Sequence, residues 1–197
     1  MESKRVVESP SFTGAVLTGG RSTRMGRDKA LLPVWEIPMA LRVARAMLEA
    51  GATETFFVGG DAATLGSLEL RVIADSTPHE GPLAGIIGAL REAGEKVVVV
   101  TACDMPWIRG EHVSALVDSL HEFDVVMSAC AGQVQPLHAA WKRASLDELV
   151  AAFHSGERSP LRAIRDMNSS IVDLGIGAWS IDLDTMADVE AISPEPT

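Results

Sequence analysis

The chain has 197 residues, of which 47% are hydrophobic and 22% charged, and its formal net charge is −10. This length and apolar content predict one globular domain with a sizeable core and exclude a globally disordered chain. Sequence-independent binding to nucleic acid depends on Lys and Arg, and so does polybasic binding to membranes. A chain this acidic is expected to do neither. Its apolar runs are far shorter than the roughly 20 residues that span a membrane.

Along the chain, β-branched apolar runs alternate with helical patterns. Strands are predicted over 14–17, 55–58, 71–74, 97–101, 125–129, 137–141 and 171–174. Helices are predicted over 38–49, 81–93, 112–120, 145–153, from 159–160 onward for a short stretch, and over 185–192. This alternation predicts an α/β fold, a three-layer, doubly wound and mostly parallel sheet.

Several local signals refine this prediction. The continuous apolar run over 97–101 is typical of a central parallel strand covered on both faces. Ser145 and Glu148 have the spacing of a capping box. Residues 1–12 are expected to be a flexible leader, 13–192 a single domain, and 193–197 a fraying tail. Cys103 and Cys130 form no CxxC pair and are expected to be buried free thiols in a reducing cytoplasm.

The loop after the first predicted strand carries the strongest chemical signal. Residues 17–29 read L-T-G-G-R-S-T-R-M-G-R-D-K, and four of the chain's 17 Lys and Arg residues fall between 21 and 29. Glycines let backbone N–H groups approach an anion, and basic side chains hold phosphate oxygens, so the loop predicts polyphosphate binding. The spacing fits neither the P-loop nor the dinucleotide fingerprint. The alternative is an ordinary glycine turn with a solvated basic rim.

Two further strand ends carry candidate residues, because ligands of such sheets bind outside the carboxyl ends of the strands. Asp75 follows the third strand, and Gly81-Pro82-Leu83-Ala84-Gly85 then opens a helix whose free N–H groups suit an anion or a base edge. Asp104 ends the most apolar strand, where one carboxylate is well placed for Mg²⁺. Alternatively, Asp75 caps a helix, the glycines serve helix–sheet packing, and Asp104 forms a turn before Pro106.

The sequence G-G-x-S-x-R-M-G-x-D-K resembles the signature loop of the molybdenum cofactor nucleotidyltransferases, and it is most similar to the guanylyl branch. The resemblance extends from about residue 13 to 192 and implies a Rossmann-like nucleotidyltransferase fold. It implies transfer of GMP from GTP to the terminal phosphate of molybdopterin, with release of pyrophosphate and Mg²⁺ as cofactor. Molybdoenzymes or their chaperones are the implied recipients of the product.

Residue roles follow from the resemblance by position. The catalytic residues it implies are Arg24, Lys29 and Asp104. The nucleotide-binding residues it implies are Leu17, Thr18, Gly19, Gly20, Lys29, Asp75, Gly81, Pro82, Leu83 and Asp104. Asp104 is the implied metal ligand. Asp182 and Asp184 either add a carboxylate near the metal or cap the last helix.

The chain departs from the guanylyl pattern at two places. Asp182 and Asp184 stand where the guanylyl enzymes usually carry asparagines, and Glu36 replaces a glycine near the signature loop. Gly20 and the Arg-Asp-Lys ending of the loop favour the guanylyl branch. The alternatives are cytidylyl or other nucleotidyl transfer to molybdopterin or another phosphorylated metabolite, and a non-catalytic nucleotide-binding module. Arg158, Arg162 and Arg165 are candidates for pterin binding by charge, or form a solvated face.

Overall fold

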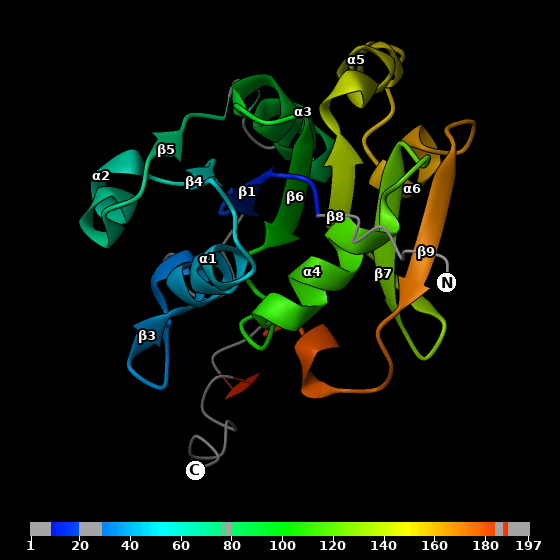
Figure 1. Ribbon diagram of the computed structural model, residues 1–197. Helices are drawn as coiled ribbons and strands as arrows, with labels where there is room; N and C mark the ends of the chain where they lie inside the picture. Colours follow the sequence, from blue (N-terminus) through cyan, green and yellow to red (C-terminus); the bar gives the residue numbers. More distant parts are fainter. Residues whose placement is uncertain (1–8, 20–28, 76, 78–79, 184–186, 189–197) are drawn as a thin grey trace.

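Seven strands build one central sheet in the order β5-β4-β1-β6-β8-β7-β9 (Figure 1). The computed structural model describes residues 9–19, 29–75, 77, 80–183 and 187–188. The strands are β1 (Phe12–Leu17), β4 (Glu54–Val58), β5 (Val72–Ile73), β6 (Val97–Ala102), β7 (Val125–Cys130), β8 (Gln133–Lys142) and β9 (Ser169–Asp173). All pairings within this sheet are parallel except those that β8 makes with β6 and β7, which confirms the mostly parallel sheet.

The reversed direction of β8 has a local cause. Only Ala131 and Gly132 connect β7 to β8, and both have positive φ, 50° and 80°. Two-residue connections with this backbone form tight hairpins, which leave no room for the crossover that a parallel strand needs. The strand predicted over 137–141 therefore extends back to Gln133 and begins at the edge of the sheet where its parallel neighbours end.

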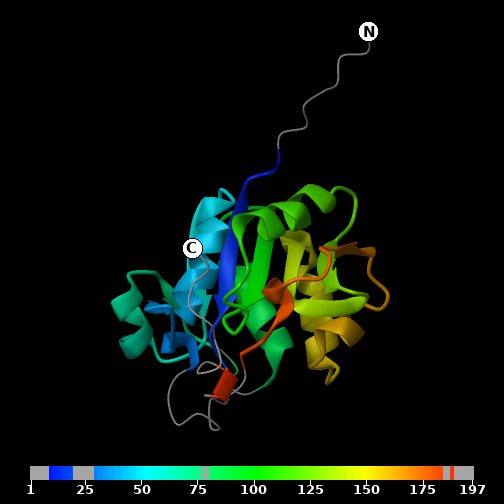
Figure 2. The same ribbon diagram turned by 90° about the horizontal axis from the view of Figure 1, so that it is seen from below.

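Helices cover both faces of the sheet, which confirms the three-layer, doubly wound arrangement (Figures 1 and 2). One face carries α1 (Met39–Glu49) and α4 (Gly110–Ser119), and the other carries α3 (Pro82–Glu92), α5 (Leu146–His154) and α6 (Pro160–Ala163). The short helix α2 (Ala62–Leu65) follows β4. Every residue of β6 is buried between the two layers, as its continuous apolar run predicts. No described helix is long and apolar enough to cross a bilayer.

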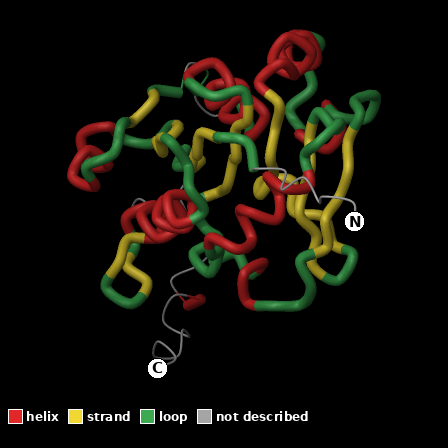
Figure 3. Tube along the Cα trace, in the orientation of Figure 1, coloured by secondary structure: helices red, strands yellow, loops and turns green. Residues whose placement is uncertain are grey.

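Short elements account for most differences from the prediction (Figure 3). A small hairpin of β2 (Pro33–Val34) and β3 (Ile37–Pro38) precedes α1, so Pro38 is the N-cap and not a helical residue. The capping box predicted at Ser145 is wrong, since Ser145 lies in the 3-10 turn Arg143–Ser145 and its hydroxyl donates to the Asp124 carbonyl at 3.4 Å. The helix predicted over 185–192 lies largely outside the described residues.

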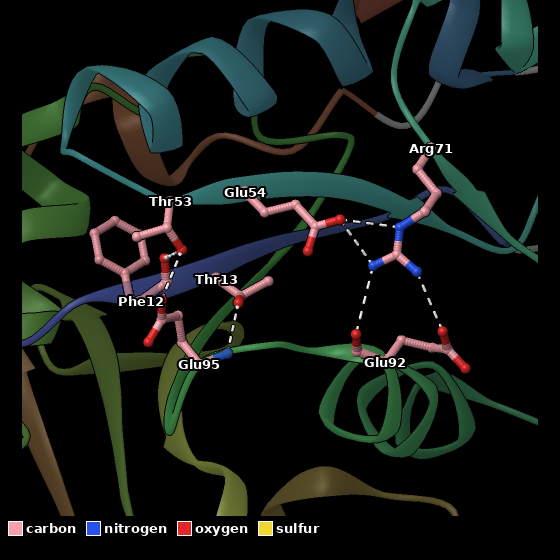
Figure 4. Close-up of polar contacts among 7 residues, drawn as sticks. All are labelled: Phe12, Thr13, Thr53, Glu54, Arg71, Glu92 and Glu95. Carbon is pink, nitrogen blue, oxygen red and sulfur yellow. Dashed lines mark hydrogen bonds and ion pairs between the residues drawn. The ribbon is translucent and has the colours of Figure 1, made fainter.

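The amino-terminal part of the domain begins earlier than expected. Phe12 starts β1 and is buried, although the predicted leader extends to residue 12. The neighbouring loops are joined by polar contacts, shown in Figure 4, where Thr53 donates to the Phe12 carbonyl at 3.2 Å. Cys103 is a buried free thiol as predicted, whereas Cys130 is a free thiol that is half-buried.

A single arginine connects the edge of the sheet to the helix that covers it. Arg71, next to β5, donates to Glu54 on β4 at 3.0 Å and to the Glu92 carboxylate on α3 at 3.2 Å (Figure 4). Its guanidinium also lies over the ring of Phe56, 4.6 Å from the ring centroid. These contacts join the C-terminal end of α3 to the starts of the edge strands β4 and β5.

Candidate active site

The loops after β1 and β4 stay paired beyond the ends of their strands. The N–H groups of Thr18 and Gly19 both donate to the Val58 carbonyl, at 2.9 and 3.1 Å, and the Thr18 hydroxyl donates to the Gly59 carbonyl at 2.8 Å. We expected these N–H groups to face a phosphate. In this structure both N–H groups instead continue the parallel pairing of β1 with β4. The backbones of the two loops lie close together at this point.

Three turns meet where this pairing ends. A Cβ atom placed on Gly59 would lie 2.8 Å from Gly19 Cα, and Gly59 has a φ of 78°, so glycine is required there on both grounds. A Cβ atom on Gly19 would lie 3.6 Å from the Asp75 carboxylate. The structure thus brings the predicted residues Gly19 and Asp75 together, and it adds Gly59, which the sequence analysis missed. The Gly59-Gly60 pair directly after a predicted strand is the signal that identifies it.

The predicted turn Gly81-Pro82-Leu83 begins α3 as expected. Gly81 is the N-cap with a φ of 94°, Pro82 occupies the first turn, and Leu83 is buried. On the inner side of the helix, a Cβ atom at Gly85 would lie 3.1 Å from the Leu17 side chain. Gly85 therefore serves tight packing of α3 on β1, and this packing sets the N-terminus of α3 beside the end of β1. Asp75 also accepts a hydrogen bond from Thr77 N–H at 3.0 Å, an Asx turn leading toward this helix.

The central feature of the site is an ion pair between the end of the signature loop and the end of β6. Lys29 Nζ lies 2.8 Å from Asp104 Oδ2, and the two side chains are only 16% and 26% exposed. Lys29 begins the 3-10 turn Lys29–Leu31, which packs against α1. Asp104 follows Cys103, whose N–H donates to the Leu17 carbonyl at 3.1 Å, so it leaves the sheet next to the Thr18 turn. Residues 75 positions apart in sequence thus form one charged centre.

The late motif reaches the same centre. The N–H of Leu183 donates to the Asp104 carbonyl at 3.0 Å, and this places Asp182 in the segment next to Asp104. Asp182 is exposed and Leu183 is buried. Gly20, Arg24 and Asp184 lie outside the described residues, so their predicted roles stay predictions.

The donor set at this centre fits a magnesium ion. Mg²⁺ is typically held by one or two carboxylates, with substrate phosphate oxygens and waters completing the octahedron. Asp104 supplies one carboxylate at a partly exposed strand end, and Asp182 is a candidate for a second. Within the described ranges, no three His, Cys, Asp or Glu side chains gather as a metal cluster, so this part of the chain offers no closed zinc site.

The arginines considered for pterin binding make other contacts. Arg158 pairs with Glu80 at 2.6 Å and lies over the Phe153 ring, and its backbone carbonyl would lie 3.5 Å from a Cβ atom on Gly81. Arg162 pairs with Glu157, and this hydrogen bond, with that from Ser159 N–H, lowers the pKa of Glu157 to about 2. Arg158 therefore supports the turn before α3, and Arg162 belongs to a surface ion pair.

This fold, with its candidate functional groups at the carboxyl edge, is that of a nucleotidyltransferase domain. The fold is shared with molybdopterin-guanine dinucleotide biosynthesis protein A from Archaeoglobus fulgidus, with a TM-score of 0.73 and 24% identity, covering 90% of this chain and 95% of that chain. Residues 14–170 match the MobA-like NTP transferase domain, and the chain belongs to this family.

Two curated relatives of this chain have similar names. It is 35% identical over 133 residues to a probable molybdenum cofactor guanylyltransferase from Carboxydothermus hydrogenoformans, a match that covers 68% of this chain and 66% of that protein. It is 33% identical over 179 residues to a probable molybdenum cofactor guanylyltransferase from Chloroflexus aggregans, covering 86% of this chain and 83% of that protein.

Proposed function

We propose that the protein is a Mg²⁺-dependent guanylyltransferase that transfers GMP from GTP to the terminal phosphate of molybdopterin and releases pyrophosphate. The observation that carries this proposal is the Lys29–Asp104 pair, which joins the signature loop to the end of β6. The names of the relatives from Carboxydothermus and Chloroflexus support the choice of GTP and molybdopterin. The product would then pass to a molybdoenzyme or its chaperone.

This reaction needs positioning and charge neutralisation more than a strong base. A phosphate monoester has its second pKa near 6, so the attacking phosphate is already largely a dianion at pH 7. The main barrier is therefore the repulsion between two anions that must be held in line. A lysine and an aspartate that carries a cation are suited to this task, because they place fixed positive charge where the negative charge develops.

Lys29 and Asp104 neutralise each other in this structure, at 2.8 Å. When substrates bind, each side chain would exchange this partner for another of opposite sign. Lys29 would turn to the β- and γ-phosphates, together with Arg24, and Asp104 would hold Mg²⁺. The metal ion, when bound, supplies charge neutralisation at the α-phosphate. The ion pair thus keeps both groups in place without leaving either charge uncompensated beforehand.

The nucleotide would lie over the turns after β1, β4 and β5. Gly19 and Gly59 let the turns after β1 and β4 pack closely beside the Asp75 carboxylate. The N-terminus of α3 at Gly81 and Pro82 lies on the same side of the sheet and offers N–H groups to an anion or a base edge. Asp75 would contact the ribose or the base.

One observation favours the cytidylyl alternative. The guanylyl enzymes that the sequence resembles usually have asparagine at the position of Asp182, and the structure places this residue in the segment bonded to Asp104. Aspartate at this position is commoner in the related cytidylyl enzymes. The choice of base is therefore the first point to test.

The test is thermal stabilisation by GTP, CTP, ATP and UTP, each with and without Mg²⁺. A ligand at 100 times its Kd adds about 2.7 kcal/mol of stability, which is readily seen as a shift of the midpoint. We expect a large shift with GTP that Mg²⁺ increases, followed by release of pyrophosphate when molybdopterin is added. A preference for CTP would move the proposal to cytidylyl transfer. Nucleotide binding without pyrophosphate release from any of the four would support a non-catalytic binding module.

A further inference from the structure

A second feature of the carboxyl edge lies apart from the turns proposed to bind the nucleotide. A groove of about 780 Å³ opens on the side of the sheet that α1 and α4 cover, and its lining includes Trp35, Arg42, Trp107 and Trp179. In Figure 1 the segments that contribute to it, the β2–β3 hairpin, the start of α4 and the residues after β9, all lie toward the lower edge of the molecule. The volume is within the range of small-molecule sites.

The wall of this groove is unusually aromatic for this chain. Three of the chain's four tryptophans line the groove, although Phe, Trp and Tyr make up only 5% of the sequence. The rings of Trp35 and Trp107 lie 4.7 Å apart between centroids and are tilted by 58°. The guanidinium of Arg42 lies 4.8 Å from the centroid of the Trp35 ring, and its Nε donates to the Pro106 carbonyl at 3.1 Å. The two half-buried rings are therefore held in fixed positions.

The backbone that presents Trp35 is itself held in an unfavourable conformation. Trp35 and Glu36 form the turn between β2 and β3 with φ values of 47° and 66°. Residues other than glycine, asparagine and aspartate rarely adopt this left-handed conformation, and a bulky side chain there is a genuine outlier. Such strain persists where the surrounding structure imposes it, and it gathers at ligand sites. Here it directs a large planar side chain onto the groove.

The inner end of the groove adjoins the reaction centre. Pro106 and Leu183 line the groove, and Leu183 N–H donates to the carbonyl of Asp104 at 3.0 Å. The predicted nucleotide turns at Gly81 and Gly85 lie on the opposite side, since α3 packs on the other face of the sheet. A molecule in the groove would therefore approach Asp104 from the side opposite the nucleotide, as an acceptor must.

The outer part of the groove has both apolar surface and a carboxylate. Ile176 and Ile181 line it and are 89% and 52% exposed, two of the large apolar side chains that the described surface leaves open. Glu111, at the start of α4, also lines it. A carboxylate can accept two parallel hydrogen bonds from adjacent N–H groups, such as those of a 2-amino-4-oxo pyrimidine ring.

We infer that this groove binds the planar heterocycle of the acceptor, with the ring against Trp35 and Trp107 and its donor edge toward Glu111. The inference rests on the proposed function, because it takes Asp104 as the centre at which the acceptor's phosphate reacts. Stacking of a fused heteroaromatic ring on tryptophan is strong and does not depend on specific hydrogen bonds. The groove thereby selects a flat, phosphorylated heterocycle over a sugar phosphate, which has no aromatic face.

The test compares two substitutions of one residue. Trp35→Asn removes the ring but tolerates the left-handed backbone, whereas Trp35→Phe keeps an aromatic face. We expect the Kd for molybdopterin, measured by anaerobic calorimetry without nucleotide, to rise about tenfold or more in Trp35→Asn. It should change little in Trp35→Phe. Glu111→Gln should weaken the binding of molybdopterin but not the binding of a sugar phosphate. The Kd for GTP and the unliganded thermal midpoint serve as controls in every variant.

The outcomes separate this inference from the proposed function. An unchanged Kd and KM for molybdopterin in Trp35→Asn would overturn the inference while leaving guanylyl transfer intact. A loss of GTP affinity with unchanged molybdopterin affinity would also overturn it, since the groove would then hold the nucleotide. A wild-type protein that binds molybdopterin through Trp35 but transfers no nucleotide would support the groove and refute the proposed function. If Trp35→Asn lowers the midpoint sharply, Trp107→Leu provides the same comparison from the opposite ring.

Discussion

A buried histidine makes the stability of this protein sensitive to mild acid. His138 on β8 is fully buried, and its Nδ1 lies 2.9 Å from the hydroxyl of Thr101 on β6. Burial disfavours the charged imidazolium, with a smaller contribution from the charge of His112, and the pKa of His138 falls to about 3. The ring is therefore neutral at any pH at which the enzyme would work.

The size and sign of the effect follow from proton linkage. The pKa of His138 is 6.5 in the unfolded chain and about 3 in the folded one, so between these values the unfolded state binds one proton more. The free energy of unfolding is then fully retained above pH 6.5 and falls by about 1.4 kcal/mol for each pH unit below it. Integration from pH 7 to pH 5 gives a loss of about 2 kcal/mol from this residue alone.

Denaturant unfolding at pH 7, 6 and 5 measures this loss. The comparison is with His138→Gln, whose side-chain amide can still bond to Thr101 but carries no titrating group. Burial also lowers the pKa of His112, which adds to the acid sensitivity of both proteins in the same direction. The difference between them isolates His138, and the wild type should lose about 2 kcal/mol more between pH 7 and pH 5. His121→Gln, a substitution of an exposed histidine, is the matched control and should behave as wild type.

The reasoning would be refuted by a simple result. If wild type and His138→Gln lose the same free energy of unfolding between pH 7 and pH 5, His138 does not stay neutral in the folded protein. A uniformly less stable His138→Gln with an unchanged pH dependence would show only that the glutamine packs poorly. The slope against pH, and not the absolute stability, is therefore the quantity that decides.

Three further predictions concern the site. Asp104→Asn should keep the wild-type thermal midpoint within a few degrees and lose Mg²⁺-dependent pyrophosphate release about 100-fold or more, and normal turnover would exclude Asp104 as the metal ligand. Lys29→Ala should lower kcat about 100-fold as well as raise KM for the nucleotide, whereas a higher KM alone would show that Lys29 contributes only to ground-state binding. Gly59→Ala should cost about 2 kcal/mol or more by denaturant unfolding, because of its positive φ and the 2.8 Å approach to Gly19, and Gly51→Ala, at a positive φ with open space around it, is its control for backbone strain alone.

The sequence pattern was sufficient to predict the class of fold and to select both residues of the ion pair as candidates. Alternating apolar runs and helical periods predict a doubly wound sheet, because each element must bury one stripe or both faces. In such a sheet, residues directly after strands meet at one edge. Asp104 after β6 and Lys29 at the end of the signature loop could therefore be assigned to one site before any contact was known, and their 2.8 Å separation agrees with that assignment.

Contacts between distant segments were decided only by the tertiary structure. The direction of β8, the use of the Thr18 and Gly19 N–H groups by Val58, and the close approach of Gly59 to Gly19 depend on which strands become neighbours. The Ser145 hydroxyl was likewise taken by a carbonyl 21 residues away instead of its own helix. Local patterns do not contain this information, since a donor bonds to whichever acceptor packing brings near.

The same distinction applies to the two substrate sides of the site. The glycines and basic residues of the signature loop stand close together between residues 19 and 29, so this part of the predicted nucleotide side can be recognised in a short stretch of sequence. The aromatic groove is assembled from Trp35, Trp107 and Trp179, which are far apart in sequence and resemble core residues when considered singly. The sequence by itself predicted a polyphosphate site after β1. The tertiary structure determined which side chains line the groove, because only packing shows which apolar side chains remain open to solvent.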